Sequence, residues 1–227
     1  MKEFLNNISL KEANAFFLSA WSLIVLLLIT KKIFRKETPI YLKLIPLYIF
    51  LIFLQLSIGE YYHFGVPYRN GKENPTNISA YIFIILEYSI FAILLSKFIK
   101  LTLIKKYLIF SCILFTIIAI IIWYLNPSFV RIISVTTAIE SISVIPFCLY
   151  YFFELLIHPP LLKLTMEPSF WITTGILFLF ICITPLYLSM EYFKKDTEIQ
   201  IIDYFGYDLV VFFLAKASFI NIKRKNG

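Results

Sequence analysis

Residues 134–146 read SVTTAIESISVIP and lie in the middle of an apolar run that is long enough to cross a lipid bilayer. This stretch nevertheless contains one carboxylic acid and five hydroxyl groups. On a helix they form a stripe over two adjoining faces, with Thr136, Glu140 and Ser143 on one and Ser134, Thr137 and Ser141 on the other. Because lipid offers polar groups no hydrogen-bond partner, we expect this stripe to face other helices or a hydrated cavity.

The composition of the whole chain indicates a membrane protein. Of the 227 residues, 60% are hydrophobic and only 15% are charged, whereas soluble domains contain roughly a quarter charged residues. The hydrophobic residues also occur in long blocks, which is typical of membrane spans. No run of Gly, Pro or Ser suggests a linker, so residues 1–227 are expected to form a single domain.

The expected fold is an all-α bundle of seven transmembrane helices. Lysines follow the first apolar run at once, the reverse of the charge order in a cleavable signal peptide, so this first helix is expected to be retained. The sequence His158-Pro159-Pro160 is expected to end the fifth helix. The predicted spans cover residues 15–30, 40–58, 78–96, 107–125, 129–157, 170–190 and 201–220.

The distribution of basic residues predicts the orientation. The loops on one side of the predicted bundle contain nearly twice as many Lys and Arg residues as those on the other. The positive-inside rule then places the N-terminus outside and the C-terminus in the cytoplasm, as in a bacterial inner-membrane protein. The net charge of +7 does not indicate nucleic-acid binding, because the basic residues lie in short loops between helices.

Three acids within apolar runs are candidate binding residues for a small ligand or a proton. Counted from the outer ends of their spans, Glu87 and Glu140 lie roughly 14 and 16 Å deep, and Asp208 lies roughly 10 Å deep. An intramembrane acid is a functional candidate by default. The alternative is a neutral carboxyl group that is hydrogen-bonded across a helix interface. Thr136 and Ser143 join the candidates because they share the face of Glu140.

Lys216 is the cation placed deepest inside a predicted span, and three roles are open to it. Its ammonium group could reach the cytoplasmic surface, or it could form a salt bridge with Glu140. It could also bind retinal as a Schiff base with Glu87 as counter-ion, as in microbial rhodopsins. Against retinal, Phe212 stands one turn before the lysine where those proteins have an acid, and we expect no cofactor.

The remaining candidates are weaker. In the predicted outer loop, residues 59–77, a ligand or a pH change could act on Glu60, His63 and Arg69. The three cysteines have no metal-ligand spacing and are expected to be small buried hydrophobic residues. No metal site is expected, and the sequence contains no metalloprotease, nucleophile-elbow or phosphate-loop motif, so no enzyme is expected.

One pattern in the C-terminal half resembles a known group of proteins. Glu140 is followed by the aromatic run YYFF at 150–153, then EPSFWI at 167–172 and GILF at 175–178. This pattern is similar to that of uncharacterised seven-helix membrane proteins of Bacteroidota. The resemblance implies a small helical membrane protein and is compatible with a sensory role.

Two functions follow from these expectations. The first is a sensory or partner-dependent module that binds a small ligand or proton near Glu140 and passes a change in helix tilt to a cytoplasmic or membrane signalling partner. The second is a small secondary transporter or proton-coupled carrier that uses the buried acids, with helices broken at Pro46, Pro146 and Pro185. A lipid-modifying enzyme ranks third, since no nucleophile or metal ligand set is found.

Overall fold

The computed structural model describes residues 10–33, 38–65, 75–125, 129–160, 163–189 and 197–226, and these contain seven α-helices and no strand. Two short 3-10 helices, η1 (Ile40–Lys43) and η2 (Leu164–Met166), precede α3 and α7. The expectation of an all-helical chain is therefore confirmed for the described part. The α-helices are α2 (Leu10–Ile33), α3 (Leu44–Gly65), α4 (Pro75–Phe98), α5 (Thr102–Leu125), α6 (Phe129–Ile157), α7 (Pro168–Ser189) and α8 (Thr197–Asn226).

The helix limits differ from the predicted spans mainly where polar residues continue a helix. The limits of α6 are those predicted, and the chain leaves this helix at His158. In contrast, α3 continues to Gly65, so the prediction that Glu60 and His63 lie in a loop is wrong for their backbone. No proline interrupts residues 59–65, and polar or charged residues are compatible with a helix beyond the apolar part.

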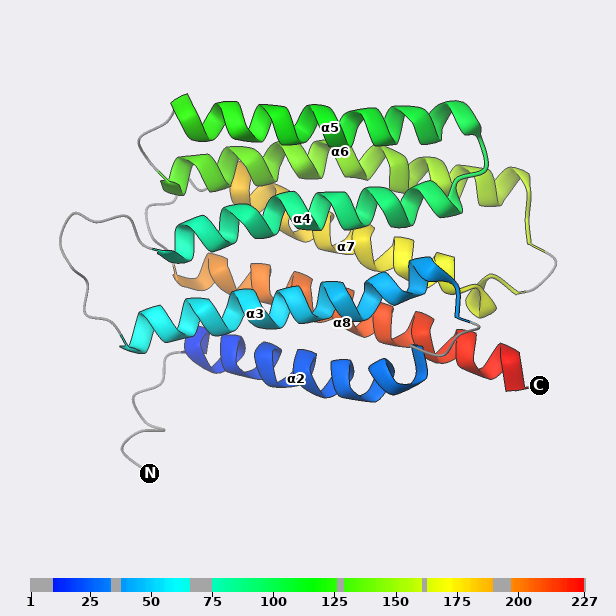
Figure 1. The fold of residues 1–227 in the computed structure, drawn as a ribbon, viewed down its shortest axis with the longest axis horizontal. Helices are drawn as coiled ribbons and strands as arrows, with labels where there is room; N and C mark the ends of the chain where they lie inside the picture. The colour runs from blue at the N-terminus through cyan, green and yellow to red at the C-terminus, as the bar shows by residue number, and fades with distance from the viewer. Residues whose placement is uncertain are drawn as a thin grey trace.

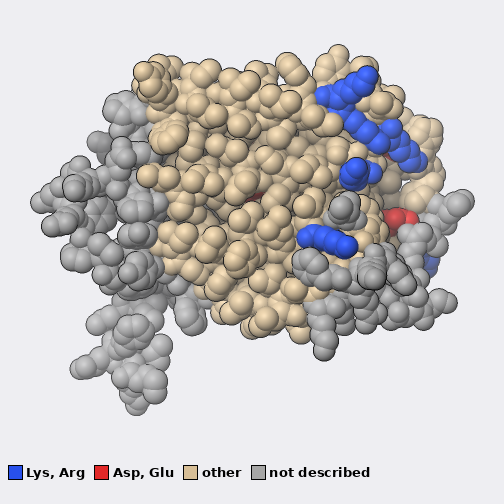
Figure 2. Space-filling model, in the orientation of Figure 1, with Lys and Arg blue, Asp and Glu red and all other residues tan. Residues whose placement is uncertain are grey.

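Five of the helices are long and apolar enough to cross a membrane. These are the segments at Tyr41–Ile58, Ile78–Phe98, Thr102–Leu125, Ile133–Ile157 and Pro168–Leu188. The first helix, α2, contains a shorter apolar stretch at Phe17–Thr30. On the face shown in Figure 2, the described surface consists mostly of uncharged residues, and the lysines visible in this view gather toward one end of the bundle. This distribution is that of a membrane-embedded protein.

Six helices form a closed ring, and the seventh lies outside it. Each neighbour in the order α2, α3, α4, α6, α7, α8 packs against the next, and α8 packs back against α2. Among the described helices, α5 packs mainly against α4 and α6, and it forms one edge of the molecule in Figure 1. Sequence neighbours are therefore not always neighbours in the ring, because α6 takes the place beside α4.

Aromatic side chains fill the middle of the ring. Tyr48 of α3 packs on Phe91 of α4 with ring centroids 4.8 Å apart, and Phe91 meets Phe180 of α7 edge-on at 5.7 Å. All three side chains are fully buried. Such contacts add to the dispersion energy of a packed interior. They fix the relative positions of α3, α4 and α7 around the polar residues described below.

Two of the prolines at which the carrier hypothesis would break a helix do not do so. Pro146 lies inside α6 and Pro185 inside α7, and both helices are continuous. The prediction of broken helices at these positions is therefore wrong. A membrane helix tolerates proline when neighbouring helices and side chains satisfy the freed backbone group. Pro46 lies in the first turn of α3, where a missing N–H group removes no helical hydrogen bond.

Candidate functional site

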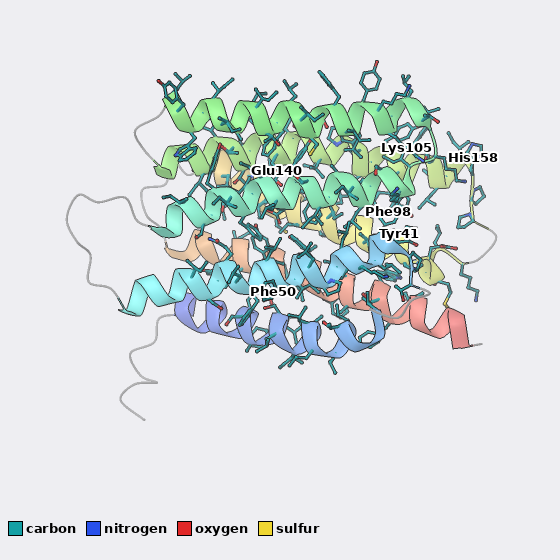
Figure 3. All side chains as sticks on the ribbon, viewed as in Figure 1. Tyr41, Phe50, Phe98, Lys105, Glu140 and His158 are labelled. Carbon is teal, nitrogen blue, oxygen red and sulfur yellow. The ribbon has the colours of Figure 1, made fainter. Side chains whose placement is uncertain are left out.

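The two acids predicted near mid-membrane, Glu87 and Glu140, both point into the protein. Only 1% of Glu87 and 0% of Glu140 is exposed. They lie on α4 and α6, which are neighbours in the ring, and Figure 3 shows Glu140 in the bundle interior where these helices run side by side. The two carboxyl groups interact electrostatically. The expectation that neighbouring helices cover both acids is confirmed.

Glu87 is held by hydroxyl groups from two other helices. The Tyr48 hydroxyl of α3 donates to Glu87 Oε1, and the Tyr207 hydroxyl of α8 donates to Glu87 Oε2 at 3.3 Å. Phe83 packs beside both tyrosines, with ring centroids 6.4 Å from Tyr48 and 6.0 Å from Tyr207. This one carboxyl group therefore connects α3, α4 and α8.

Glu140 has different surroundings. Both of its carboxyl oxygens are buried without a hydrogen-bond partner, and so is the hydroxyl oxygen of Thr137 one turn earlier on α6. A buried carboxylate without donors is strongly disfavoured, and a second negative charge on Glu87 would disfavour it further. The Glu87–Glu140 pair, named here for these two residues, can therefore take up one positive charge.

The hydroxyl stripe around Glu140 is buried as predicted, but its members differ in bonding. Ser134, Thr136, Thr137 and Ser141 are buried, and Ser143 is partly buried. Ser141 donates to the Thr137 carbonyl oxygen at 2.8 Å, and Ser143 donates to that of Ile139 at 2.7 Å. Ser143 also interacts with the Tyr88 hydroxyl, which lies 2.9 Å from Ser111 of α5. Ser143 therefore links α6 to α4 and α5.

Lys216 does not contact either acid of the pair. Its ammonium group lies over the ring of Trp171, 3.4 Å from the centroid, in a cation–π contact at the beginning of α7. The Trp171 ring is held by a hydrogen bond from Nε1 to the Thr165 carbonyl oxygen at 2.9 Å. Of the three roles left open for Lys216, the salt bridge to Glu140 is therefore not formed. The retinal arrangement, which needs Lys216 beside Glu87, gains no support.

The other predicted site residues lie apart from the pair or outside the described part. Asp208 of α8 is half-buried, and its Oδ1 atom has no hydrogen-bond partner. The side chains of Glu60 and His63, and all of Arg69, are outside the described residues. Within the described part, no three His, Cys, Asp or Glu side chains lie close enough to hold a metal ion. Cys148 is buried, whereas Cys112 and Cys182 are partly buried, and all three are free.

Sequence reasoning missed Glu154 near the opposite end of α6. Its side chain is 8% exposed and accepts hydrogen bonds from the backbone N–H groups of Lys100 and Leu101 at 2.8 and 3.1 Å. These groups lie in the turn between α4 and α5. A carboxylate is favoured there because the first N–H groups of a helix lack acceptors within the helix. Glu154 thus fixes the beginning of α5.

Comparison with known proteins adds no relative to this description. No protein family, curated protein or solved structure matches the chain.

Proposed function

We propose that this chain is a multi-pass membrane protein that responds to protons through the Glu87–Glu140 pair, as a sensory or partner-dependent module of a bacterial inner membrane. The observation that carries the proposal is the state of Glu140. Its carboxyl group is fully buried, has no hydrogen-bond donor and interacts with a second buried acid. Such a pair is stable with one proton and unstable without it. The packing of the helices around the pair therefore depends on whether that proton is bound.

The proposed topology has seven spans, with the N-terminus outside and the C-terminus in the cytoplasm. Five helices meet the length and apolarity of a span, and α2 and α8 complete the ring with four of them. Lysines gather at the end of the bundle where α4 meets α5, which supports a cytoplasmic location for that end. The group of seven-helix proteins of Bacteroidota that the C-terminal half resembles is proposed as its family.

Tyr207 supplies the link from the pair to the rest of the molecule. It connects Glu87 to α8, the helix that carries the C-terminus. A change in the charge of the pair alters how strongly the tyrosine hydroxyl groups are bound. A separate protein would then detect a shift of α8. This requires that the proton binds with different affinity to the bundle before and after the shift.

Tryptophan fluorescence of the purified protein in lipid nanodiscs tests the proposal. Trp171 stacks on Phe213 of α8, so its emission should report on movement between α7 and α8. We expect the wild-type emission to change with pH and the Glu140→Gln variant to lose this change. Asp208→Asn is the control and should keep it. A flat wild-type titration, or an unchanged response in Glu140→Gln, would contradict the proposal.

A proton-coupled carrier is the second candidate, and the interacting acids of α4 and α6 favour it. It ranks lower because α6 and α7 run unbroken through Pro146 and Pro185. Proteoliposomes with a pH-sensitive dye inside separate the two functions. A carrier would move protons under an imposed gradient, and Glu140→Gln would stop this movement; a sensory module would give the leak rate of protein-free liposomes.

A further inference from the structure

The two acids of the pair are not equivalent. Both oxygens of Glu87 accept hydrogen bonds from tyrosine hydroxyl groups, whereas neither oxygen of Glu140 accepts any. Hydrogen-bond donors aimed at a carboxyl group favour its ionised form, because the carboxylate is an acceptor only. A buried carboxyl group without donors is stable only when it is neutral. The hydrogen-bond pattern therefore favours an ionised carboxylate at Glu87 and a neutral carboxylic acid at Glu140.

The face of α6 that carries Glu140 is also asymmetric along the helix. Toward the Phe129 end, one turn away, Thr136 and Thr137 place two buried hydroxyl groups beside the acid, and buried Ser134 follows. Toward the other end, Ser143 also lies one turn away, but its hydroxyl group already donates to the Ile139 carbonyl oxygen, whereas that of Thr137 has no partner. Val144 and Cys148 occupy the positions four and eight residues after Glu140. Hydroxyl groups can accept and donate a proton, whereas a valine side chain cannot.

Few other titratable groups act on Glu140. Glu87 and Tyr88 of α4 interact with it electrostatically. From α5, Cys112 interacts with Tyr88 and not directly with the acid. On α6 itself, Cys148 lies two turns away. On α8, Tyr207 bonds to Glu87, and Lys216 lies on Trp171. The described part thus places no cation on Glu140.

We propose that Glu140 is the member of the pair that carries the proton, and that it exchanges this proton with the aqueous phase at the end of the bundle where α6 begins. The inference rests on the proposed proton response. It adds which residue carries the proton and toward which end of the bundle that proton is exchanged. In each exchange the unpartnered side chains of Glu140 and Thr137 first rotate into hydrogen-bond contact. The O–H bond of Glu140 then breaks as its proton passes to the Thr137 hydroxyl, each hydroxyl releases its own proton as it accepts one, and Thr136 passes a proton on to the water at that end. A proton arriving by the same path re-forms the bond, so Glu87 stays ionised.

Infrared spectroscopy of the protein in lipid nanodiscs at neutral pH tests the assignment. A protonated carboxyl group has a carbonyl stretching band that a carboxylate lacks. Subtracting the Glu140→Gln spectrum from that of the wild type should reveal this band. The corresponding subtraction for Glu87→Gln should show no loss of the band, since Glu140 remains buried. Asp208→Asn is the control and should leave the band of Glu140 in place.

The possible outcomes separate this inference from the proposed function. A band lost in Glu87→Gln and kept in Glu140→Gln, or halved in both, would overturn the assignment while leaving a proton on the pair. A wild-type protein with no band from either residue would overturn the assignment and the proposed function together.

The direction of exchange is tested by transfer of the same samples into heavy water. Deuteration shifts the carbonyl band of an acid, so the time course gives its exchange rate. Thr137→Val keeps the shape of the side chain and removes the hydroxyl group, and we expect exchange to slow several-fold. Ser141→Ala is the matched control, because the Ser141 hydroxyl is bonded within α6, and it should exchange at the wild-type rate. An unchanged rate in Thr137→Val would overturn the proposed path.

Discussion

The hydroxyl groups on Glu87 show how single residues hold this bundle together. In water a carboxylate is surrounded by donors, and inside the ring Tyr48 and Tyr207 take over that role. Each tyrosine also contributes a ring to the aromatic interior. Loss of one hydroxyl group leaves a buried acceptor with fewer donors, and this cost is larger for a charged acceptor than for a neutral one.

A pair of Tyr→Phe variants should separate a bonded hydroxyl group from an unbonded one. Tyr48→Phe removes a donor to Glu87, and we expect the free energy of unfolding to fall by about 1–3 kcal/mol. The Tyr81 hydroxyl is buried without a partner, so Tyr81→Phe should leave stability unchanged or raise it. Thermal unfolding in detergent measures both, and equal destabilisation by the two variants would contradict the assigned hydrogen bond.

Thr137→Val is expected to stabilise the protein. The Thr137 side chain is 3% exposed, and its hydroxyl group has no partner, so valine removes an unsatisfied polar atom at constant shape. We expect a gain of about 1 kcal/mol in the same unfolding measurement. Thr116→Val is the comparison, since the Thr116 hydroxyl donates to the Cys112 carbonyl oxygen at 2.9 Å. A loss of stability in Thr137→Val as large as that in Thr116→Val would show that the Thr137 hydroxyl is bonded.

Part of the site could be predicted from the sequence at this scale. Glu87 and Glu140 are conspicuous because an acid in an apolar run is costly, and both are buried as expected. Their hydroxyl donors were not predicted, because the chain has 15 tyrosines and nothing local distinguishes Tyr48 or Tyr207. Those partners depend on which helices become neighbours, and hydropathy does not encode that.

Among the elements, α7 and α8 approach each other closely at two glycines. A Cβ atom at Gly175 would lie 2.9 Å from Phe213 Cβ, whereas one at Gly206 would lie 3.3 Å from the end of the Leu179 side chain. A β-carbon cannot move without its backbone, but the end of a leucine can rotate. Contact at small residues is a common way for membrane helices to pack.

The two glycines should therefore respond differently to alanine. Gly175→Ala forces α7 and α8 apart, and we expect a loss of about 1–3 kcal/mol in stability from overpacking. In Gly206→Ala the better helix propensity of alanine, about 1 kcal/mol, should offset the mild crowding. Urea or thermal unfolding in detergent measures both variants. A Gly175→Ala protein as stable as Gly206→Ala would show that the helices can separate freely.

Glu154→Gln should loosen the beginning of α5 without disturbing the ring. The amide side chain offers one acceptor oxygen where the carboxylate offers two, so one of the Lys100 and Leu101 N–H groups loses its acceptor. We expect faster hydrogen exchange at these two amides. The His158 amide, which donates to the Glu154 backbone oxygen at 2.8 Å, is the internal reference and should not change. Equal acceleration at all three amides would indicate a general loss of structure at this end.

The existence of the elements was predictable, and their ends were less so. All seven apolar runs are helical, because apolar blocks of this length favour a helix in a bilayer. The predicted limits were placed where the hydropathy falls. This marks the boundary of the lipid, but a helix can continue beyond that boundary. Lys105 and Lys106 were therefore assigned to a loop, although both lie in α5 and lysine is a good helix former.

For the whole molecule, the proposed orientation can be measured on intact cells. Tyr124 is 89% exposed near the end of α5, and Lys106 is exposed near its beginning. With a membrane-impermeant thiol reagent, Tyr124→Cys should be labelled on intact cells and Lys106→Cys only after permeabilisation. The wild-type protein, with its own cysteines, is the control for background labelling. The reverse pattern would place the C-terminus outside.

The arrangement of the helices was the least predictable feature. Seven helices permit many circular orders, and nothing in the order of the apolar runs places α5 outside the ring. One signal was present: the α5 span has a mean hydropathy of 2.7, the highest of the five, and only 17% of it is buried. A helix that faces lipid on most sides can be apolar all round, whereas ring helices carry polar residues on their inner faces.

The contact between α2 and α8 closes the ring, and it has a consequence for biosynthesis. Until α8 has been inserted, the ring is open and the flank of α2 that α8 covers has no helix against it. During this time Glu87 also lacks Tyr207, one of its two donors. The acid site is therefore complete only when α8 is in place, and a chain truncated before α8 would present an unfinished polar interior to membrane quality control.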